Sequence, residues 1–422
     1  MKKITLLITL FVGLQWAAFS QGCLPDGIIF TTQTEIDNFQ TNHPNCSEIE
    51  GDVNIEGDNI VNLNGLASLT AVGGSLALSG TSSLVSLSGL NNITSINGNL
   101  QIANTALTGL SELSQLNTVG GNLEIGDNSE ITSLIGLEGI STLNENLAVI
   151  GNTLLPNLEG LEQLTTVGNY LWVSGNGSLQ SLSGLQSITS AGYLYVFDNP
   201  NLSAINLNAL ATVSLDVWLM QNDELTNLND LSNLLSIGGR LEISNHNTLA
   251  NLTGLASLID LDGSLTIEGN MVLNSLSGLD NITPYHLNRI TIASNPVLST
   301  CEVQSLCTYI GLPGANVTIS NNATGCNSKA ELEAACQLAN LAEVRFSNYY
   351  SLYPIPVHNF LTIKPLNQAS IDQVIIYNQL GQKEIDYQPE NNEIDVSMLT
   401  PGLYVIEIQN GEVKLRDKLL VK

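Results

Sequence analysis

The sequence predicts an all-β protein: a right-handed parallel β-solenoid of about 12 coils with disulfide caps, followed by a small C-terminal antiparallel β-sandwich. Three observations predict this fold. An aliphatic pair recurs every 23 to 25 residues, the cysteines flank this repeat, and the C-terminal residues have a different strand pattern. A fixed period of this size is typical of a solenoid, in which each coil buries its apolar side chains only against neighbouring coils.

The aliphatic pair predicts one short strand in each coil. Its first member lies at Val53, Leu76, Leu100, Leu123, Leu147, Leu171, Leu194, Val217, Leu241, Leu265, Ile290 and Val317, and the second follows two residues later. A step of two places both side chains on one face of a strand. Between strands, apolar residues recur about every third position, which indicates tight, 3₁₀-like corners. Corner glycines such as Gly184 and Gly254 are expected to adopt dihedrals that other residues resist.

A polar column accompanies the strands, five residues after each first strand position. Eight coils have Asn there (Asn128, Asn152, Asn176, Asn199, Asn222, Asn270, Asn295 and Asn322), and the other four have Asp58, Thr81, Thr105 and His246. A column of Asn in register is expected to bond the backbone groups of a corner that no β-ladder reaches. His246 is therefore expected to replace a ladder Asn; a metal or catalytic role is the alternative.

The repeat resembles the receptor L domain of growth-factor-receptor ectodomains and fungal wall proteins. Cys46-Ser-Glu-Ile-Glu-Gly-Asp-Val-Asn-Ile55 carries the resemblance, and Leu182-Ser-Gly-Leu185 and Val119-Gly-Gly-Asn-Leu-Glu-Ile125 support it. The resemblance spans roughly residues 46 to 322 and implies a leucine-rich-repeat-like solenoid that binds ligands or mediates adhesion. We expect an N-terminal cap at 21–50, the solenoid at 51–322 and a C-terminal cap, including a short helix, at 323–341.

Residues 1–20 are expected to be a secretory signal peptide. Lys2 and Lys3 precede an apolar run that ends at Leu14, and a small-x-small cleavage site ends at Ser20. This run is too short to span a membrane, and no other stretch predicts a transmembrane segment. Lipidation of Cys23 is an alternative, but Ser20 stands where a lipoprotein has an aliphatic residue.

Export makes the cysteines informative, because disulfides form outside the cytoplasm. We expect Cys23–Cys46 at the N-terminal cap and two bridges among Cys301, Cys307, Cys326 and Cys336, for which three pairings are open. A zinc site is the rival interpretation, but these spacings fit no finger pattern and no His lies nearby.

Charge is concentrated in the repeat region. The whole chain has a formal net charge of −27, and residues 23–337 contain 29 acidic and 3 basic residues. Such a surface repels nucleic acid and anionic lipid, so neither is an expected partner. Weak calcium binding at Asp260 and Asp262 is an alternative to simple solubility, but no Asp-x-Asp-x-Asp-Gly loop is present; no metal site and no cofactor are expected.

The C-terminal residues resemble the type A sorting domain of type IX secretion cargo. The matching segments are Leu352-Tyr-Pro-Ile-Pro-Val357, Ile376-Tyr-Asn-Gln-Leu-Gly381, Ile394-Asp-Val-Ser397, Leu399-Thr-Pro-Gly-Leu-Tyr404 and Lys418-Leu-Leu-Val-Lys422, with Ile355 where the family usually has Asn. We expect a linker at 342–350 and the domain at 351–422. The resemblance implies a Gram-negative protein that passes through Sec and then type IX secretion, with the secretion machinery as a partner, and is secreted or attached to the outer-membrane surface.

Aromatic residues of three adjacent coils are the candidate ligand-binding site. Tyr170, Trp172, Tyr193, Tyr195, Phe197 and Trp218 occupy the outward strand positions. Exposed aromatics on a sheet suit a sugar ring or the apolar surface of a host or matrix protein. They also make good cross-strand pairs, so a passive spacer protein is the alternative. Arg240 is expected to form an ordinary ion pair with Asp216.

No catalytic residues are predicted, and the sequence does not predict an enzyme. It has no Gly-x-Ser-x-Gly, His-Glu-x-x-His or phosphate-binding loop. A glycan-cleaving solenoid enzyme needs two nearby carboxylates. Outward acids such as Glu124 and Glu242 lie five repeats apart, which is about 24 Å along the solenoid.

Overall fold

The computed structural model describes residues 22–342, 346, 349–366, 370–379, 381–388, 392–410 and 413–422. The expected signal peptide and most of the expected linker lie outside these residues. The chain divides into two compact units, the first ending at Leu332 and the second beginning at Glu333.

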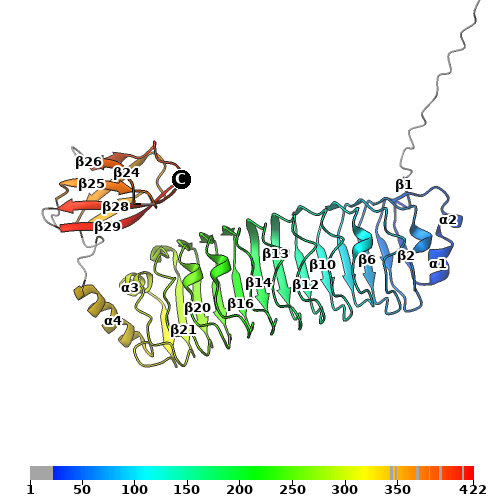
Figure 1. Cartoon of the computed structure of the whole chain (residues 1–422), viewed down its shortest axis with the longest axis horizontal. Coiled ribbons are helices and arrows are strands. Elements are labelled where there is room, and N and C mark those ends of the chain that lie inside the picture. The colour runs from blue at the N-terminus through cyan, green and yellow to red at the C-terminus, as the bar shows by residue number, and fades with distance from the viewer. Residues whose placement is uncertain are drawn as a thin grey trace, which may run out of the picture. The chain divides into compact units, whose positions relative to one another are not determined.

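The first unit is a parallel β-solenoid with one main-sheet strand per coil, as the repeat predicted (Figure 1). In every neighbouring pair the first aliphatic residue faces its equivalent, for example Leu147↔Leu171 and Leu171↔Leu194. The strands are β4 (Val53–Ile55), β6 (Leu76–Ser79), β8 (Leu100–Ala103), β10 (Leu123–Gly126), β12 (Leu147–Ile150), β13 (Thr166–Ser174), β14 (Ser190–Phe197), β16 (Val217–Met220), β18 (Leu241–Ser244), β20 (Ser264–Glu268), β21 (Arg289–Ala293) and β22 (Val317–Ser320).

Two-residue strands precede the main strands in most coils. Five of them form a separate parallel sheet: β1 (Gly22–Cys23), β3 (Glu48–Ile49), β5 (Ala71–Val72), β7 (Ser95–Ile96) and β9 (Thr118–Val119). The others pair in line with β13 and β14: β11 (Thr142–Leu143), β15 (Thr212–Val213), β17 (Ser236–Ile237) and β19 (Asp260–Leu261). In β13 and β14 the two strands of a coil join into one long strand, with a register shift between Val167 and Tyr170. These two strands carry five of the six candidate-site residues, namely Tyr170, Trp172, Tyr193, Tyr195 and Phe197.

Single 3₁₀ turns form several of the corners, which confirms the three-residue spacing. They are η1 (Asn64–Leu66), η2 (Ser111–Leu113), η3 (Asn229–Leu231), η4 (Thr253–Leu255) and η5 (Pro284–His286). Gly184 has φ +110°, and an added Cβ would lie 1.9 Å from the carbonyl oxygen of Leu158. Gly254 has no positive φ, so the expectation of an unusual dihedral is wrong there. Lack of space explains why this position has a glycine, because an added Cβ would lie 1.9 Å from the Leu228 carbonyl oxygen.

The Asn column forms a buried ladder of hydrogen bonds. Asn176 is fully buried; its Oδ1 accepts the Asn152 N–H at 2.9 Å, and its Nδ2 donates to the Val149 carbonyl at 2.9 Å. The ladder runs from Thr105 to Asn322. At its N-terminal end the prediction is wrong for Asp58, which is exposed and accepts a hydrogen bond from Ser82.

His246 takes the place of one ladder Asn, as expected. It is fully buried; its Nδ1 lies 3.3 Å from the Asn222 backbone nitrogen and 3.0 Å from the Asn222 carbonyl oxygen, and its Nε2 lies 3.0 Å from the Leu219 carbonyl oxygen. A neutral imidazole that accepts at Nδ1 and donates from Nε2 satisfies both the Asn222 N–H and the Leu219 carbonyl. Burial lowers the pKa of His246, against opposing contributions from its backbone hydrogen bonds and from Asp223.

The N-terminal cap contains a strand that the sequence did not predict. β2 (Ile28–Phe30) extends the main sheet by pairing with β4, with Ile28 facing Val53. Two short helices follow, α1 (Gln33–Asp37) and α2 (Phe39–Asn42). The Thr32 and Glu35 side chains form a capping box that starts α1. The expected disulfide Cys23–Cys46 is present.

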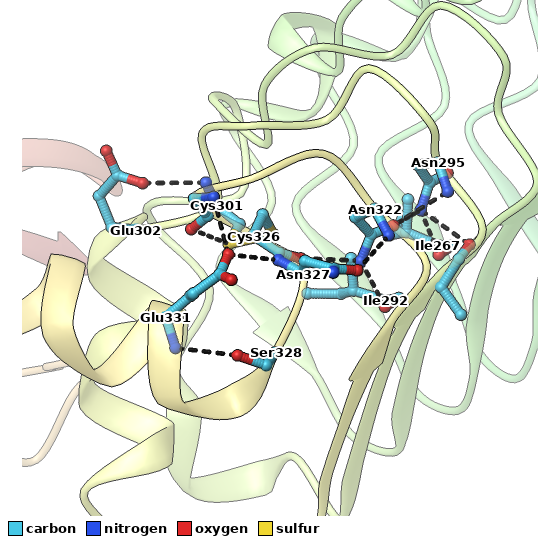
Figure 2. Close-up of a disulfide and its surroundings, with 12 residues drawn as sticks. Ile267, Ile292, Asn295, Cys301, Glu302, Asn322, Cys326, Asn327, Ser328 and Glu331 are labelled. Carbon is cyan, nitrogen blue, oxygen red and sulfur yellow. Dashed lines mark hydrogen bonds between the residues drawn. A yellow bond between two sulfur atoms is a disulfide. The ribbon is translucent and has the colours of Figure 1, made fainter.

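The C-terminal cap continues the polar ladder into a disulfide-bonded turn (Figure 2). Asn322 Nδ2 donates to the carbonyls of Ile292 and Cys326, and Cys326 is bonded to Cys301. Cys307 and Cys336 are also disulfide-bonded. Of the three pairings that the sequence left open, the structure therefore has the one in which Cys301 is bonded to Cys326. Two helices, α3 (Gln304–Ile310) and the expected α4 (Lys329–Ala342), belong to this part of the chain.

The second unit contains two antiparallel sheets, as the sequence predicted. One contains β23 (Tyr350–Tyr353), β24 (Phe360–Pro365) and β27 (Glu393–Asp395). The other has the order β26 (Lys383–Tyr387), β25 (Gln373–Tyr377), β28 (Gly402–Asn410) and β29 (Val413–Val421). Aliphatic side chains of both sheets, such as Ile363, Ile376 and Ile406, form one buried core. β23 and β26 were not predicted.

Candidate functional site

The six predicted site residues lie together on the outward side of three adjacent main strands. We call them the aromatic strip: Tyr170 and Trp172 on β13, Tyr193, Tyr195 and Phe197 on β14, and Trp218 on β16. Strand register pairs Tyr170 with Tyr193, Trp172 with Tyr195, and Tyr195 with Trp218. All six side chains are half-buried. The sequence period therefore placed every ring in the correct row.

Four rings of the strip stack in pairs across neighbouring strands. The Tyr170 and Tyr193 centroids lie 4.3 Å apart at an interplanar angle of 11°, and those of Tyr195 and Trp218 lie 4.4 Å apart at 22°. Adjacent strands of a sheet are about 4.8 Å apart, so these rings stand upright, and their edges point away from the sheet. Stacking of this kind stabilises the sheet and holds the rings rigidly.

Trp172 is oriented differently from the stacked rings. Its plane makes 79° with that of Tyr195 and 37° with that of Phe197. Its Nε1 donates to Ser174 Oγ at 2.7 Å, two residues farther along the same strand. The indole therefore extends along β13 towards Ser174, which is only 5% exposed. The repeat pattern did not predict this contact with Ser174.

Charged residues border the strip at Trp218. The Arg240 guanidinium lies 5.7 Å from the centroid of the Trp218 ring and forms an ion pair with Glu242. The predicted Arg240–Asp216 ion pair is therefore wrong. Asp216 Oδ1 instead accepts the backbone N–H of Arg240, in the next coil, at 2.8 Å. Asn146 accepts the Tyr170 N–H in the same way at 3.0 Å.

The hydroxyls of Tyr193 and Tyr195 remain protonated at neutral pH. Burial, and secondarily the nearby Asp216 carboxylate, raise the pKa of Tyr195 to about 12. Burial and contact with Tyr170 also raise the pKa of Tyr193. Protonated phenols donate as well as accept hydrogen bonds. The strip therefore combines apolar rings with neutral polar groups.

The strip ends abruptly on both sides. Towards the N-terminus, the row position that faces Trp172 is Ala148 on β12. Towards the C-terminus, the row continues from Glu242 through Thr266, Thr291 and Thr318. Glu124 and Glu242 lie on β10 and β18, with four main strands between them. Within the described residues, no group of three or more His, Cys, Asp or Glu side chains is placed to hold a metal ion.

Comparison with known families gives two matches. Residues 351–422 match the secretion system C-terminal sorting domain. Residues 45–134 match the receptor L domain. Both resemblances predicted from the sequence are confirmed, and neither family is enzymatic. No curated protein matches the chain.

The sorting domain defines the route of export. The protein is a type IX secretion cargo that interacts with the secretion machinery and is secreted or attached to the outer-membrane surface. No helix in the described part of the chain has the length and apolar character of a membrane span. The receptor L domain match ends at residue 134, before β13, so it gives no information about the aromatic strip.

Proposed function

We propose that this exported surface protein is a binding or adhesion protein, not an enzyme, and that the aromatic strip is its contact surface for a glycan or a protein. The clustering carries the proposal: six half-buried aromatic side chains occupy three adjacent strands, whereas the same row elsewhere has Ala148, Thr266 and Thr291. Tyr and Trp offer large contact areas with few rotatable bonds, so a rigid strip loses little entropy on binding.

A double substitution tests this proposal. The full chain is applied to an array of polysaccharides and extracellular-matrix proteins, beside the variant Trp172→Ala/Trp218→Ala. Whichever polysaccharide or matrix protein the native chain binds, we expect the variant to bind it at least about tenfold more weakly, because aromatic anchors dominate such contacts. Loss of the two indoles, of which only Trp218 is stacked, costs about 1 to 3 kcal/mol of stability. Circular dichroism checks that the variant remains folded.

The matched control is Thr291→Ala/Thr318→Ala, which changes the same outward row away from the strip. Equal binding by all three proteins contradicts the proposal. If the native chain binds no component, the second candidate function, a passive surface spacer, is favoured. The observation that supports a spacer is the pairwise stacking at 4.3 Å and 4.4 Å, which explains four of the rings structurally.

A further inference from the structure

We infer that the ligand of the aromatic strip is a neutral polysaccharide, one pyranose ring of which stacks on the outward face of Trp172. This inference rests on the proposed function and deepens it, because it names the ligand class and the side chain that recognises it. A sugar ring can stack only on a ring face of the strip that is open to a ligand.

Several ring faces of the strip are already covered. Tyr170 and Tyr193 cover one face of each other, as do Tyr195 and Trp218. The Arg240 guanidinium lies over the Trp218 ring at 5.7 Å from its centroid. In addition, Nε1 of Trp218 is buried and, among the described residues, has no hydrogen-bond partner. A ligand that approaches the sheet from outside therefore meets these rings at their edges.

Trp172 offers a ring face instead. Its indole lies along β13 and is held by the Nε1–Oγ hydrogen bond to Ser174. Because the indole N–H lies in the ring plane, the bond to Ser174 aligns that plane with β13; since the plane is also nearly perpendicular to that of upright Tyr195, one indole face is directed at the sheet and the opposite face outward. The angle of 79° to Tyr195 supports this orientation, since Tyr195 stands upright in its stack with Trp218.

The surroundings of Trp172 leave room for a flat ligand. On one side, Ala148 of β12 is the small residue that faces Trp172 in strand register. On the other side, Phe197 is tilted by only 37° from the indole plane, with its centroid 5.9 Å away, and extends the apolar surface. The protonated Tyr195 hydroxyl supplies a nearby neutral donor. An apolar platform with a few polar groups at its border is a common arrangement in binding sites.

The chemistry of this platform selects a neutral pyranose. The face of an aromatic ring is electron-rich, so it attracts the C–H groups that a pyranose with equatorial hydroxyls presents on its faces. Anionic sugars are disfavoured, because the chain has a net charge of −27 and Asp216 and Glu242 border the strip. A protein ligand needs no single open ring face, and it is therefore the alternative that the experiment must separate.

Two single-tryptophan variants test the assignment. In the Trp16→Phe background, Trp218→Phe leaves Trp172 as the only tryptophan, and Trp172→Phe leaves Trp218. We expect acrylamide, a neutral quencher, to quench Trp172 more strongly than Trp218. Cellohexaose, laminarin, xylohexaose, mannohexaose and chitohexaose are then added separately, with polygalacturonate as the anionic control. At least one neutral glycan should protect Trp172 from acrylamide, and polygalacturonate should not.

Affinity measurements complete the test. Trp172→Ala should weaken binding of the protecting glycan by about tenfold or more, and the control Thr291→Ala/Thr318→Ala, outside the strip, should change it by less than about threefold. Protection of Trp218 alone, or unchanged affinity in Trp172→Ala, overturns the assignment. If no neutral glycan binds at about 10 mM but the double variant loses a matrix protein, this inference fails and the proposed function survives. If the array also shows no binding, both fail.

Discussion

The buried Asn ladder makes a strong prediction about stability. Replacing Asn176 with Ala removes five hydrogen bonds: two that Oδ1 accepts from Asn152 and three that Nδ2 donates, to Val149, Ser174 and Asn199. The Asn152 N–H and the Val149 carbonyl are then buried without their ladder partner. Each unsatisfied buried group costs about 1 to 3 kcal/mol, so we expect a loss of about 2 to 6 kcal/mol. That is a large part of a typical domain stability of about 5 to 15 kcal/mol.

Urea unfolding of the full chain, followed by circular dichroism and tryptophan fluorescence, measures this loss. Asn176→Thr should cost less than Asn176→Ala, because Thr105 already occupies a ladder position and bonds to Asn128 through its hydroxyl. Asn201→Ala is the control: Asn201 is exposed and donates one hydrogen bond, to Gly177, so its loss should cost less than about 1 kcal/mol. Equal midpoints for Asn176→Ala and Asn201→Ala would refute the ladder argument.

Two further predictions concern the same coils. Because burial lowers the pKa of His246, the unfolded chain binds a proton below about pH 6.5 that the folded chain does not, and stability should fall as pH falls. His246→Asn should reduce the difference between the urea midpoints at pH 7.5 and pH 5; an unchanged difference would contradict the neutral-ladder role. Gly184→Ala should cost about 3 kcal/mol or more, since its Cβ would lie 1.9 Å from the Leu158 oxygen. Gly126→Ala, with its nearest contact at 3.6 Å, should be nearly neutral in thermal melts.

The features of the fold that could be predicted from the sequence are those that the repeat period determines. A repeat of 23 to 25 residues places Leu171 beside Leu194 and Asn176 beside Asn199, because every coil has the same neighbours. The cap strand β2 was missed for the opposite reason. The strand that contains Ile28 pairs only with β4, and its segment lacks the apolar residues at every third position that mark the other coils. The prediction that Asp58 belongs to the Asn ladder was wrong because this position, in the coil beside the N-terminal cap, is exposed to solvent.

The candidate site could be located from the sequence but not oriented. Strand period fixes the row of a side chain, so Trp172 and Trp218 looked equivalent. Their ring planes depend on side-chain torsions and on contacts that no period encodes, such as Trp172 with Ser174 and Trp218 with Arg240. The partner of Arg240 was missed for the same reason, because Asp216 and Glu242 are both near neighbours in the pattern.

The cap disulfides have a mechanical consequence for a protein at a cell surface. Cys23–Cys46 and Cys301–Cys326 join residues 23 and 25 positions apart, which is one coil in each case. A folded coil adds about 4.8 Å to the length of the solenoid, whereas the same coil pulled out into an extended chain is roughly 80 Å long. Each disulfide prevents this extension in the coil that it closes. A pulled molecule should therefore lengthen in steps of one coil from its interior, while its ends remain short.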